Sequence, residues 1–346
     1  MSGQDVYIKI KANNMSNITK ICRFFIVVFF TLICTQAASA KTFKMAIGDA
    51  AGGTQWELGT KFRDLLAESS QGKVNIELFP NGQLGNEQDT VNSAAIGLLD
   101  FSILAINNVT PFSPTVGLLT MPYLIQSTEE AVELTQGETG QELTENTVRD
   151  AGVRIIGWAY SGFRVLTNSK KPVRSPEDLK GLVIRVPRNE IMIASYQAWG
   201  VNPTPMAWSE TFTGLQQGVV DGQDNPYITV HAMQFNEVQK YVTNLRYIFS
   251  LEPLVISESI FQQQSPELKN MIIDAGKKAS EHSVMFLLEK EHQIRRTLEK
   301  KGMVFYEPAD GEKAWKERVM KSVWPKFYSS IGGREQVDKA LQILDR

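Results

Sequence analysis

Two arginines lie in apolar stretches of the sequence, where a permanent charge is costly. Arg185 lies in the apolar run 182–187, and Arg164 follows Gly162 and Phe163. A guanidinium inside an apolar strand needs an anionic partner, because an unpaired buried charge costs several kcal/mol. Two such arginines are suited to bidentate binding of a carboxylate. Two alternatives stay open for each arginine: an ion pair with an internal Asp or Glu, and a side chain directed to solvent.

Two further side chains are placed to contact a ligand. Asn225 precedes Pro226, which keeps the Asn225 backbone out of the helical region and presents its amide at a helix entrance. Trp208 lies in a loop that contains two prolines, and its ring could pack on the face of a ligand. A plain helix N-cap for Asn225 and a core position for Trp208 are the competing interpretations.

Sequence motifs of catalysis and metal binding are absent. The chain has three histidines and two cysteines, and it contains no H-E-x-x-H, C-x-x-C, G-x-S-x-G, P-loop or G-x-G-x-x-G motif. His282 and His292 fall on different turns of a predicted helix. We therefore predict no catalytic residue, no metal site and no cofactor. A carboxylate-dependent enzyme stays open as an alternative, because paired Asp and Glu residues need no local motif.

The composition is that of a folded, globular protein. Of 346 residues, 42% are hydrophobic and 21% are charged, which excludes wholesale disorder. The formal net charge is −2, so the sequence gives no reason to expect a nucleic-acid partner.

The N-terminus has the pattern of a secretory signal peptide. Lys20 and Arg23 precede the apolar run 24–34, which leads to an Ala-x-Ala exit ending at Ala40. The run is shorter than the ~20 residues that a transmembrane helix needs. We predict cleavage after Ala40, which removes both cysteines and leaves a periplasmic chain without disulfides. Residues 1–14 then either follow an upstream translation start that is not used or belong to a long n-region of the signal peptide.

The remaining chain reads as an α/β protein. Strands are predicted over 42–47, 74–78 and 99–104, with helices over 56–68 and 86–96, and this alternation favours a parallel sheet covered by helices. The second half repeats the pattern. Its predicted strands are 153–158, 164–167 and 182–186, its predicted helices are 190–199, 209–218 and 226–238, and a turn is predicted at 221–222.

One predicted helix is unusually long. Ser265 and Pro266 form its start signal, and Gly302 is a plausible C-cap, which gives a helix over 266–301. At 1.5 Å per residue its length is about 50 Å, enough to span two lobes. Because no low-complexity linker interrupts the chain, we expect lobes that are joined by several crossings.

Three motifs in chain order resemble those of the solute-binding proteins of TRAP (tripartite ATP-independent periplasmic) transporters, most closely the dicarboxylate- and sialic-acid-binding branch. They are 181–187, 203–210 and 215–226, and 80–87 and 162–164 match as well. The resemblance covers essentially the whole mature chain. It implies a two-lobed periplasmic-binding-protein-like fold, with a ligand cleft between the lobes and the long helix spanning both. The implied divisions are a cleaved signal peptide (1–40), the N-terminal part of lobe I (41–161), the main part of lobe II (162–249) and returning segments (250–346).

The resemblance also implies roles for five residues. Arg185 matches the arginine that pairs with the ligand carboxylate, and Arg164 matches a second arginine of the family. Asn225 matches the amide of the Gly-Gln-Asp-Asn-Pro motif, and Trp208 matches the aromatic residue before Ser-Glu. Glu87 matches an acid that often reaches ligand hydroxyls.

The sequence departs from the family pattern at two places. Residues 104–108 replace the polar and charged cleft residues of sialic-acid binders, which argues against sialic acid. Arg188 occupies a position that is often polar and neutral. If Arg188 faces the cleft, it provides for a second anionic group; otherwise it is a solvated helix start. An aromatic wall of the cleft is predicted from Trp158, Tyr160, Phe163 and Trp208.

The implied function is that of a periplasmic receptor that acts as a monomer. It would bind a small organic acid and deliver it to TRAP membrane permease subunits by secondary transport, without an ATP site. Uronates and other sugar acids, dicarboxylates, and 2-oxo or aromatic acids all fit a cleft with two arginines. The alternatives are a ligand-sensing periplasmic module for a membrane sensor and a carboxylate-dependent periplasmic enzyme.

Overall fold

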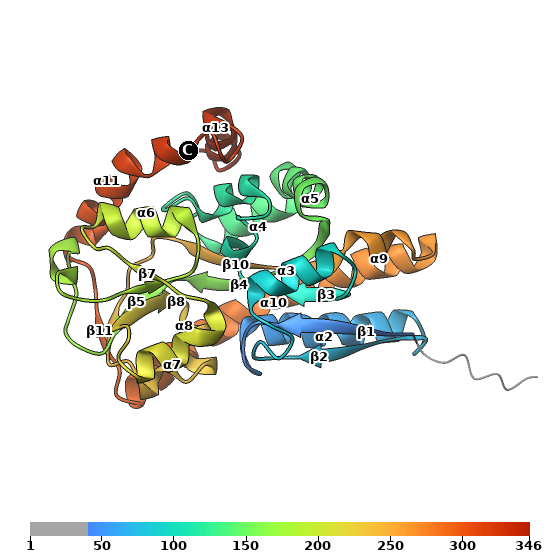
Figure 1. Cartoon of the computed structure of the whole chain (residues 1–346), viewed down its shortest axis with the longest axis horizontal. Helices are drawn as coiled ribbons and strands as arrows, with labels where there is room; N and C mark the ends of the chain where they lie inside the picture. The colour runs from blue at the N-terminus through green and yellow to red at the C-terminus, as the bar shows by residue number, and fades with distance from the viewer. Residues whose placement is uncertain (1–40) are drawn as a thin grey trace, which may run out of the picture. The chain divides into compact units, whose positions relative to one another are not determined.

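Residues 41–346, the part of the chain that the computed structural model describes, fold around two main sheets (Figure 1). The predicted signal peptide, 1–40, lies outside the described residues. The larger sheet has the order β2-β1-β3-β10-β4. Its strands are β1 (Lys41–Ile47), β2 (Val74–Phe79), β3 (Phe101–Ile103), β4 (Val153–Phe163) and β10 (Phe249–Ser257). β1 pairs in parallel with β3, whereas β10 runs antiparallel to both β3 and β4.

The second sheet is smaller and has the order β11-β9-β5-β8. Its strands are β5 (Val165–Asn168), β8 (Gly222–Asn225), β9 (Tyr241–Thr243) and β11 (Val304–Tyr306). A separate parallel pair, β6 (Arg185–Val186) and β7 (Thr204–Pro205), lies beside it through a bridge between Ile184 and Gly222. The part of the chain around each sheet is called the first and the second lobe below.

The chain crosses between the lobes at a narrow place. β4 of the larger sheet ends at Phe163 and β5 of the smaller sheet begins at Val165, so Arg164 lies in the crossing itself. The return crossing follows β9 and enters β10 at Phe249. The two crossings lie side by side, because the Arg164 backbone N–H donates to the carbonyl of Ile248 at 3.0 Å.

Helices cover both sheets. The α-helices other than the longest are α2 (Thr54–Ser69), α3 (Glu87–Ala95), α4 (Thr128–Gln136), α5 (Glu138–Ala151), α6 (Glu190–Ala198), α7 (Thr211–Gln216), α8 (Tyr227–Ala232), α9 (Glu258–Gln262), α11 (Lys313–Ser322), α12 (Trp324–Phe327) and α13 (Arg334–Ile343). Short 3-10 turns are η1 (Ile106–Asn108), η2 (Pro114–Thr120), η3 (Pro176–Leu179), η4 (Trp208–Glu210), η5 (Phe235–Glu237) and η6 (Ala309–Glu312). No helix within 41–346 has both the length and the apolar character that a membrane span requires.

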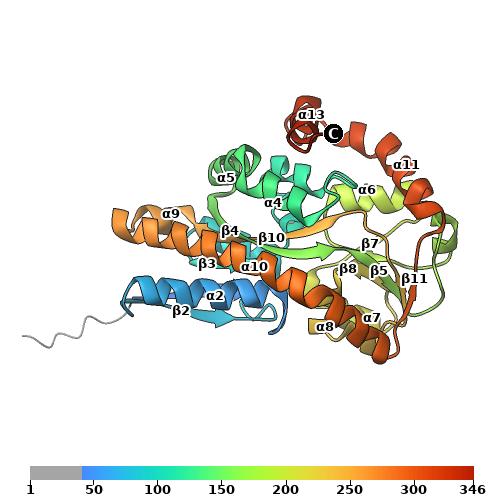
Figure 2. The ribbon, with the colours of Figure 1, turned by 180° about the vertical axis from the view of Figure 1, so that it is seen from behind.

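The longest helix, α10 (Pro266–Lys300), confirms the prediction for 266–301. Its Ser265 cap accepts a hydrogen bond from the Leu268 backbone N–H. At 1.5 Å per residue its 35 residues extend over about 52 Å. The helix contacts α2 and β4 of the first lobe and α8 of the second. Figure 2 shows α10 running from the α9 end of the larger sheet to the region of α7 and α8.

The contact between α10 and β4 depends on small residues of the helix. β4 is an edge strand, so half of its N–H groups lack a strand partner. Two of them are satisfied from the helix, since Trp158 N–H donates to Ser280 Oγ at 2.8 Å and Tyr160 N–H donates to Ser283 Oγ at 3.0 Å. A Cβ added at Gly276 would lie 2.0 Å from the Ile156 carbonyl oxygen. The helix therefore approaches the strand at a distance that only glycine permits.

Three sequence predictions about elements need correction. The strand predicted over 153–158 continues through Ser161 and Gly162 to Phe163, where the positive φ of Gly162 (88°) lets the strand bend. The strand predicted over 182–186 consists only of Arg185 and Val186. The helix predicted over 226–238 ends at Ala232, because Gln234 adopts a left-handed conformation.

None of the strands β7 to β11 was predicted from the sequence, and two of these, β8 and β10, have an unusual composition. Gly222–Asn225, expected to begin with a turn, is the buried strand β8, whose four residues are polar or glycine. β10 occupies an inner position of its sheet even though it contains Glu252 and Pro253. Proline normally excludes an inner strand because it cannot donate to the ladder. The pairing with β4 shifts register after Ser250 and again after Leu254, which accommodates the irregular segment between them.

Candidate functional site

Residues from both lobes line a cavity with two adjacent chambers. The outer chamber has a volume of about 410 Å³. It is lined in the first lobe by Gly48, Ala50, Asn81, Gly82, Gly85, Asn86 and Glu87, and in the second by Trp208, Ser209, Phe212, Thr213, Ala232, Met233 and Gln234. The inner chamber has about 20 Å³ of free volume, room for little more than one water molecule. Glu87 and Trp208 line both chambers and therefore lie at the boundary between them.

Arg185 is a buried cation that lines the inner chamber. It is 2% exposed, and its Nε and Nη2 donate to the Met206 carbonyl at 3.1 and 2.8 Å. In the described part of the chain no carboxylate oxygen lies within 4.0 Å of its nitrogens, the limit for an ion pair. Burial and the nearby charge of Arg164 lower its pKa to about 10. The guanidinium thus lacks the anionic partner that would compensate for its burial.

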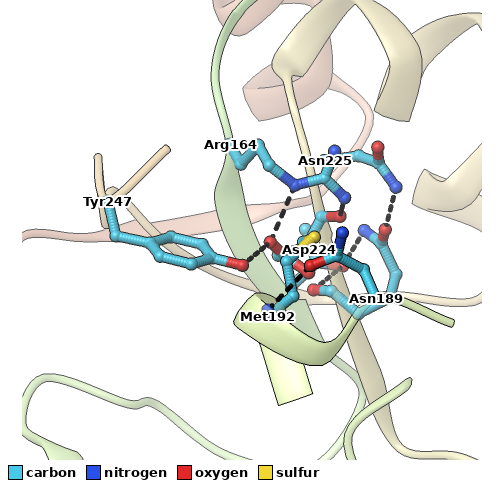
Figure 3. A network of polar contacts seen from close by, with 8 residues as sticks. Arg164, Asn189, Met192, Asp224, Asn225 and Tyr247 are labelled. Atoms are coloured by element: carbon cyan, nitrogen blue, oxygen red, sulfur yellow. Dashed lines mark hydrogen bonds and ion pairs between the residues drawn. The ribbon is translucent and has the colours of Figure 1, made fainter. Parts of the chain in front are cut away.

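Arg164 lines the same chamber, but its charge has an internal partner. Its Nε donates to Asp224 Oδ2 at 2.8 Å, and its Nη2 donates to the Asp224 carbonyl (Figure 3). The Tyr247 hydroxyl donates to the same carboxylate at 2.6 Å. Burial opposes the charge, but Asp224 and Tyr247 together raise the pKa of Arg164 above its ordinary value. The ion pair with an internal Asp, one of the alternatives considered for both arginines, is observed for Arg164.

Asn225 and Trp208 also line the inner chamber. The Asn225 Nδ2 donates to Gln223 Oε1 at 2.5 Å, a contact within strand β8 that holds the amide in place (Figure 3). The Trp208 ring packs edge-on against Phe235, with 5.6 Å between centroids, and the Arg185 Cζ lies 5.6 Å from its centroid. Trp208 is therefore both a core residue of the second lobe and a wall of the cavity.

Glu87 begins α3 and is held by three hydrogen-bond donors. Its carboxylate accepts from Gln55 Nε2 at 3.2 Å, from the Ala105 backbone N–H at 3.1 Å and from Asn108 Nδ2. Burial nevertheless raises its pKa, because these bonds compensate only in part for the loss of solvent. These hydrogen bonds fix the Glu87 side chain at the boundary between the two chambers.

Arg188 does not line either chamber. Its side chain is 54% exposed, and its Nη2 lies 4.0 Å from Glu210. The solvated helix start, one of the two interpretations of this residue, agrees with that position. The structure thus brings five of the six predicted residues together and leaves Arg188 outside.

Two buried carboxylates of the inner chamber were missed by the sequence analysis. Asp49 is 1% exposed and Glu252 is 3% exposed, and one oxygen of each lacks a hydrogen-bond partner. Burial and the charge of Glu87 raise the pKa of Asp49 to about 7, and burial and Asp49 raise that of Glu252 well above its usual range. Asp49 follows β1, at the strand end where α/β sheets bind ligands, which is a signal that could have identified it.

Contacts across the cavity join the two lobes directly. Asn189 Nδ2 donates to the Asn107 carbonyl at 3.1 Å, and Gln88 Nε2 donates to the Arg188 carbonyl at 3.4 Å. These contacts hold the two walls close together. Among the described residues, no group of three or more His, Cys, Asp and Glu side chains is arranged to hold a metal ion.

Comparison with known proteins gives consistent matches. Residues 49–331 match the model of the bacterial extracellular solute-binding proteins, family 7. A solute-binding protein of Roseobacter denitrificans is 36% identical over 310 residues, which cover 88% of this chain and 94% of that protein.

Two crystal structures are similar to the described fold. The structure of that Roseobacter protein, a TRAP periplasmic solute-binding protein with bound L-galactonate, has a TM-score of 0.82 at 33% identity, covering 88% of this chain and 100% of that one. An apo, open TRAP periplasmic solute-binding protein from Rhodobacter sphaeroides has a TM-score of 0.72 at 35% identity, covering 88% and 99%.

Proposed function

Because the chain belongs to family 7 of the bacterial extracellular solute-binding proteins, we propose that its cavity binds a small organic acid through the guanidinium of Arg185. The observation that carries this proposal is the burial of Arg185 without an ionic partner. A ligand carboxylate would supply the missing charge and would form bidentate, charge-assisted hydrogen bonds. The Roseobacter relative, which holds L-galactonate, supports an acid as the ligand.

The proposed role of the other lining residues follows from their positions. Arg164 adds positive potential to the inner chamber, although Asp224 balances its charge. The Asn225 amide and the Trp208 ring bound the site, and Glu87 lies between the inner and the outer chamber. Arg188 has no part in this proposal.

The proposed receptor works outside the cytoplasm with TRAP membrane permease subunits. The family consists of extracellular solute-binding proteins, and its TRAP members serve transport. We propose that this chain delivers its acid unchanged and catalyses no reaction. Turnover of a bound acid by the purified protein would contradict that part of the proposal.

The lobes are proposed to move about the crossings. We propose 41–161 as the N-terminal part of the first lobe, 162–249 as the main part of the second lobe, and 250–346 as the segments that return. The first limit lies near the end of β4, and the second lies near the start of β10. The described conformation is more similar to the acid-bound Roseobacter structure than to the open Rhodobacter one. We infer that it is the closed form, and that opening enlarges the small inner chamber. A ligand that contacts both lobes then favours closure.

A thermal-unfolding screen against organic acids tests this proposal. The protein is purified from the periplasm and heated with sugar acids, dicarboxylates, and 2-oxo and aromatic acids. A ligand present at about 100 times its Kd stabilises the folded state by roughly 2.7 kcal/mol. We expect at least one acid to raise Tm, and Arg185→Ala to abolish that rise.

The control is Arg334→Ala, which removes an exposed arginine of α13 that pairs with Asp338. This variant should respond to the acid like the unaltered protein. An Arg185→Ala protein that binds the acid with unchanged affinity would refute the role of Arg185.

A further inference from the structure

Four buried polar atoms of the inner chamber have no hydrogen-bond partner. They are Asp49 Oδ2, Trp208 Nε1, Thr229 Oγ1 and Glu252 Oε2, and all four residues line the chamber. A buried polar group without a partner costs about 1–3 kcal/mol. The two carboxyl oxygens accept hydrogen bonds, or donate one when the group is protonated, whereas the indole donates and the hydroxyl does either. Trp208 and Thr229 lie close enough to Asp49 to lower its pKa, so they satisfy its carboxyl in part. A ligand that completes these contacts carries groups that both donate and accept.

The charges around the chamber are unevenly distributed. Arg185 is the one lining cation without an ion-pair partner in residues 41–346, because Arg164 is paired with Asp224. The other ionisable groups of the lining are the carboxyls of Asp49, Glu87 and Glu252. Burial, and after it the charge of a neighbouring carboxyl, raises the pKa of Asp49 and of Glu252.

A second ligand carboxylate would be unfavourable in this surrounding. Once the first carboxylate has paired with Arg185, a second would meet three carboxyl groups and no free cation of the lining. Arg188, which could have served a second anionic group, is half-exposed and faces Glu210 outside the chamber. The lining thus opposes a dicarboxylate and favours uncharged groups next to Asp49 and Glu252.

We propose that the ligand is a polyhydroxylated monocarboxylate, whose hydroxyl groups bind Asp49 and Glu252 while its carboxylate pairs with Arg185. This rests on the proposed function and narrows its ligand class. A hydroxyl group donates to a carboxylate and accepts from Trp208 Nε1 or Thr229 Oγ1, so a chain of hydroxyls satisfies all four unpartnered atoms. The remaining hydroxyls extend past Glu87 and Trp208 into the outer chamber, since the inner chamber alone is too small for the whole acid.

Isothermal titration calorimetry on the protein purified from the periplasm tests the ligand class. The probes are D-erythronate and L-galactonate as hydroxy acids, butanoate and hexanoate as acids of the same chain lengths without hydroxyls, succinate as a dicarboxylate and serine as a zwitterion. We expect a hydroxy acid to bind at least about 100-fold more tightly than any other probe, since several hydrogen bonds to buried polar groups are lost without hydroxyls.

Variants assign this preference to the two carboxyls. Asp49→Asn and Glu252→Gln keep the shape of the side chain, and each should weaken binding of the preferred hydroxy acid about 10-fold or more. Glu77→Gln, which alters an exposed carboxylate of β2, is the matched control and should leave the affinity unchanged. Thermal unfolding of each variant establishes that it is folded. If a variant does not fold, the order of affinities that the unaltered protein shows for the probes still tests the ligand class.

The outcomes separate this inference from the proposed function. If acids bind through Arg185 but succinate or hexanoate equals the best hydroxy acid, the inference is wrong and the proposed function stands. Tightest binding of serine would show that Asp49 and Glu252 hold a cation and would also overturn the inference. If no carboxylic acid binds, or binding does not need Arg185, the proposed function itself fails.

Discussion

Arg185 and Arg164 show how two similar residues acquire different surroundings. Both are buried and both line the inner chamber, yet Asp224 lies against Arg164 and no carboxylate pairs with Arg185 among the described residues. The difference follows from strand β8, which presents Asp224 toward the crossing between the lobes. The arginine without an internal anion, Arg185, is therefore the one that we propose binds the ligand.

The raised pKa of Asp49 predicts a pH dependence of stability. Its folded pKa of about 7 exceeds the ordinary value of 3.8, so the folded state holds this proton more tightly than the unfolded state. The group therefore lowers the free energy of unfolding as pH rises from about 4 to 7, by an amount on the order of 4 kcal/mol at most. Below pH 4 both states are protonated and the effect is absent.

Asp49→Asn removes this titration. We expect the ligand-free variant to gain stability relative to the unaltered protein between pH 5 and pH 8, measured as the difference in urea-unfolding free energy at constant salt. Titrations of other groups occur in both proteins and largely cancel in the difference. An equal difference at both pH values would show that Asp49 is ionised at pH 5 in the folded protein.

At the residue scale, the sequence predicted the cation and missed part of the surrounding lining. Arg185 stood out because a charge interrupted an apolar run, and the resemblance to a family added Glu87, which lines both chambers. Glu252 gave no signal, because it lies in a strand that the sequence did not predict. Whether Arg188 faces the cavity or the solvent depends on the direction of its side chain, and the spacing of residues in the sequence does not determine that direction.

At the scale of elements, the packing of α10 on β4 positions both lobes. Gly276, Ser280 and Ser283 fall on one face of the helix, three or four residues apart, and present a glycine and two hydroxyls to the edge strand. The hydroxyls satisfy backbone N–H groups of β4, and the glycine lets the helix approach closely. The same helix continues to α8 in the second lobe.

Gly276→Ala should loosen this contact. The added methyl would lie 2.0 Å from the Ile156 carbonyl oxygen, so the helix must move away from β4. We expect a loss of about 1–3 kcal/mol in the free energy of unfolding, as overpacking of a core costs, despite the higher helix propensity of alanine. Denaturant unfolding measures it, with Lys277→Ala on the exposed side of the helix as the control. A stability gain would mean that the contact is less close than described.

The elements that the sequence predicted are those with regular periodicity. β1, α2, β2 and α3 lie within about two residues of their predicted limits, and α10 matches from its Ser-Pro start. β8 and β10 escaped prediction because burial of polar residues and of a proline overrides their low strand propensity. Both strands are positioned by pairing with distant segments, which no local pattern records.

At the scale of the whole molecule, the two crossings and α10 join the lobes around one cavity. Asp49, Glu87 and Glu252 belong to segments of the first lobe, whereas Arg185, Trp208 and Thr229 come from the second. A ligand that pairs Arg185 with the first-lobe carboxyls through its hydroxyls therefore connects the two walls. Ligand binding and closure of the lobes are coupled in this account, because the ligand contacts both walls only when the lobes are closed.

The signal-peptide pattern predicts the N-terminus of the mature protein. Residues 20–40 carry a basic segment, an apolar run and an Ala-x-Ala exit, so the mature chain should begin at Lys41. Intact-mass measurement of the protein isolated from the periplasm tests this, with the protein made in the cytoplasm as the reference. A mass that includes residues before Lys41 would show that cleavage occurs elsewhere.

The central claim is that Arg185 holds the carboxylate of an organic acid inside the closed cavity. A crystal structure with the acid that stabilises the protein most tests it directly. The account predicts carboxylate oxygens at about 2.7–2.9 Å from the Arg185 guanidinium nitrogens, with the hydroxyls toward Asp49 and Glu252. An acid bound elsewhere, or with its carboxylate away from Arg185, would contradict the account.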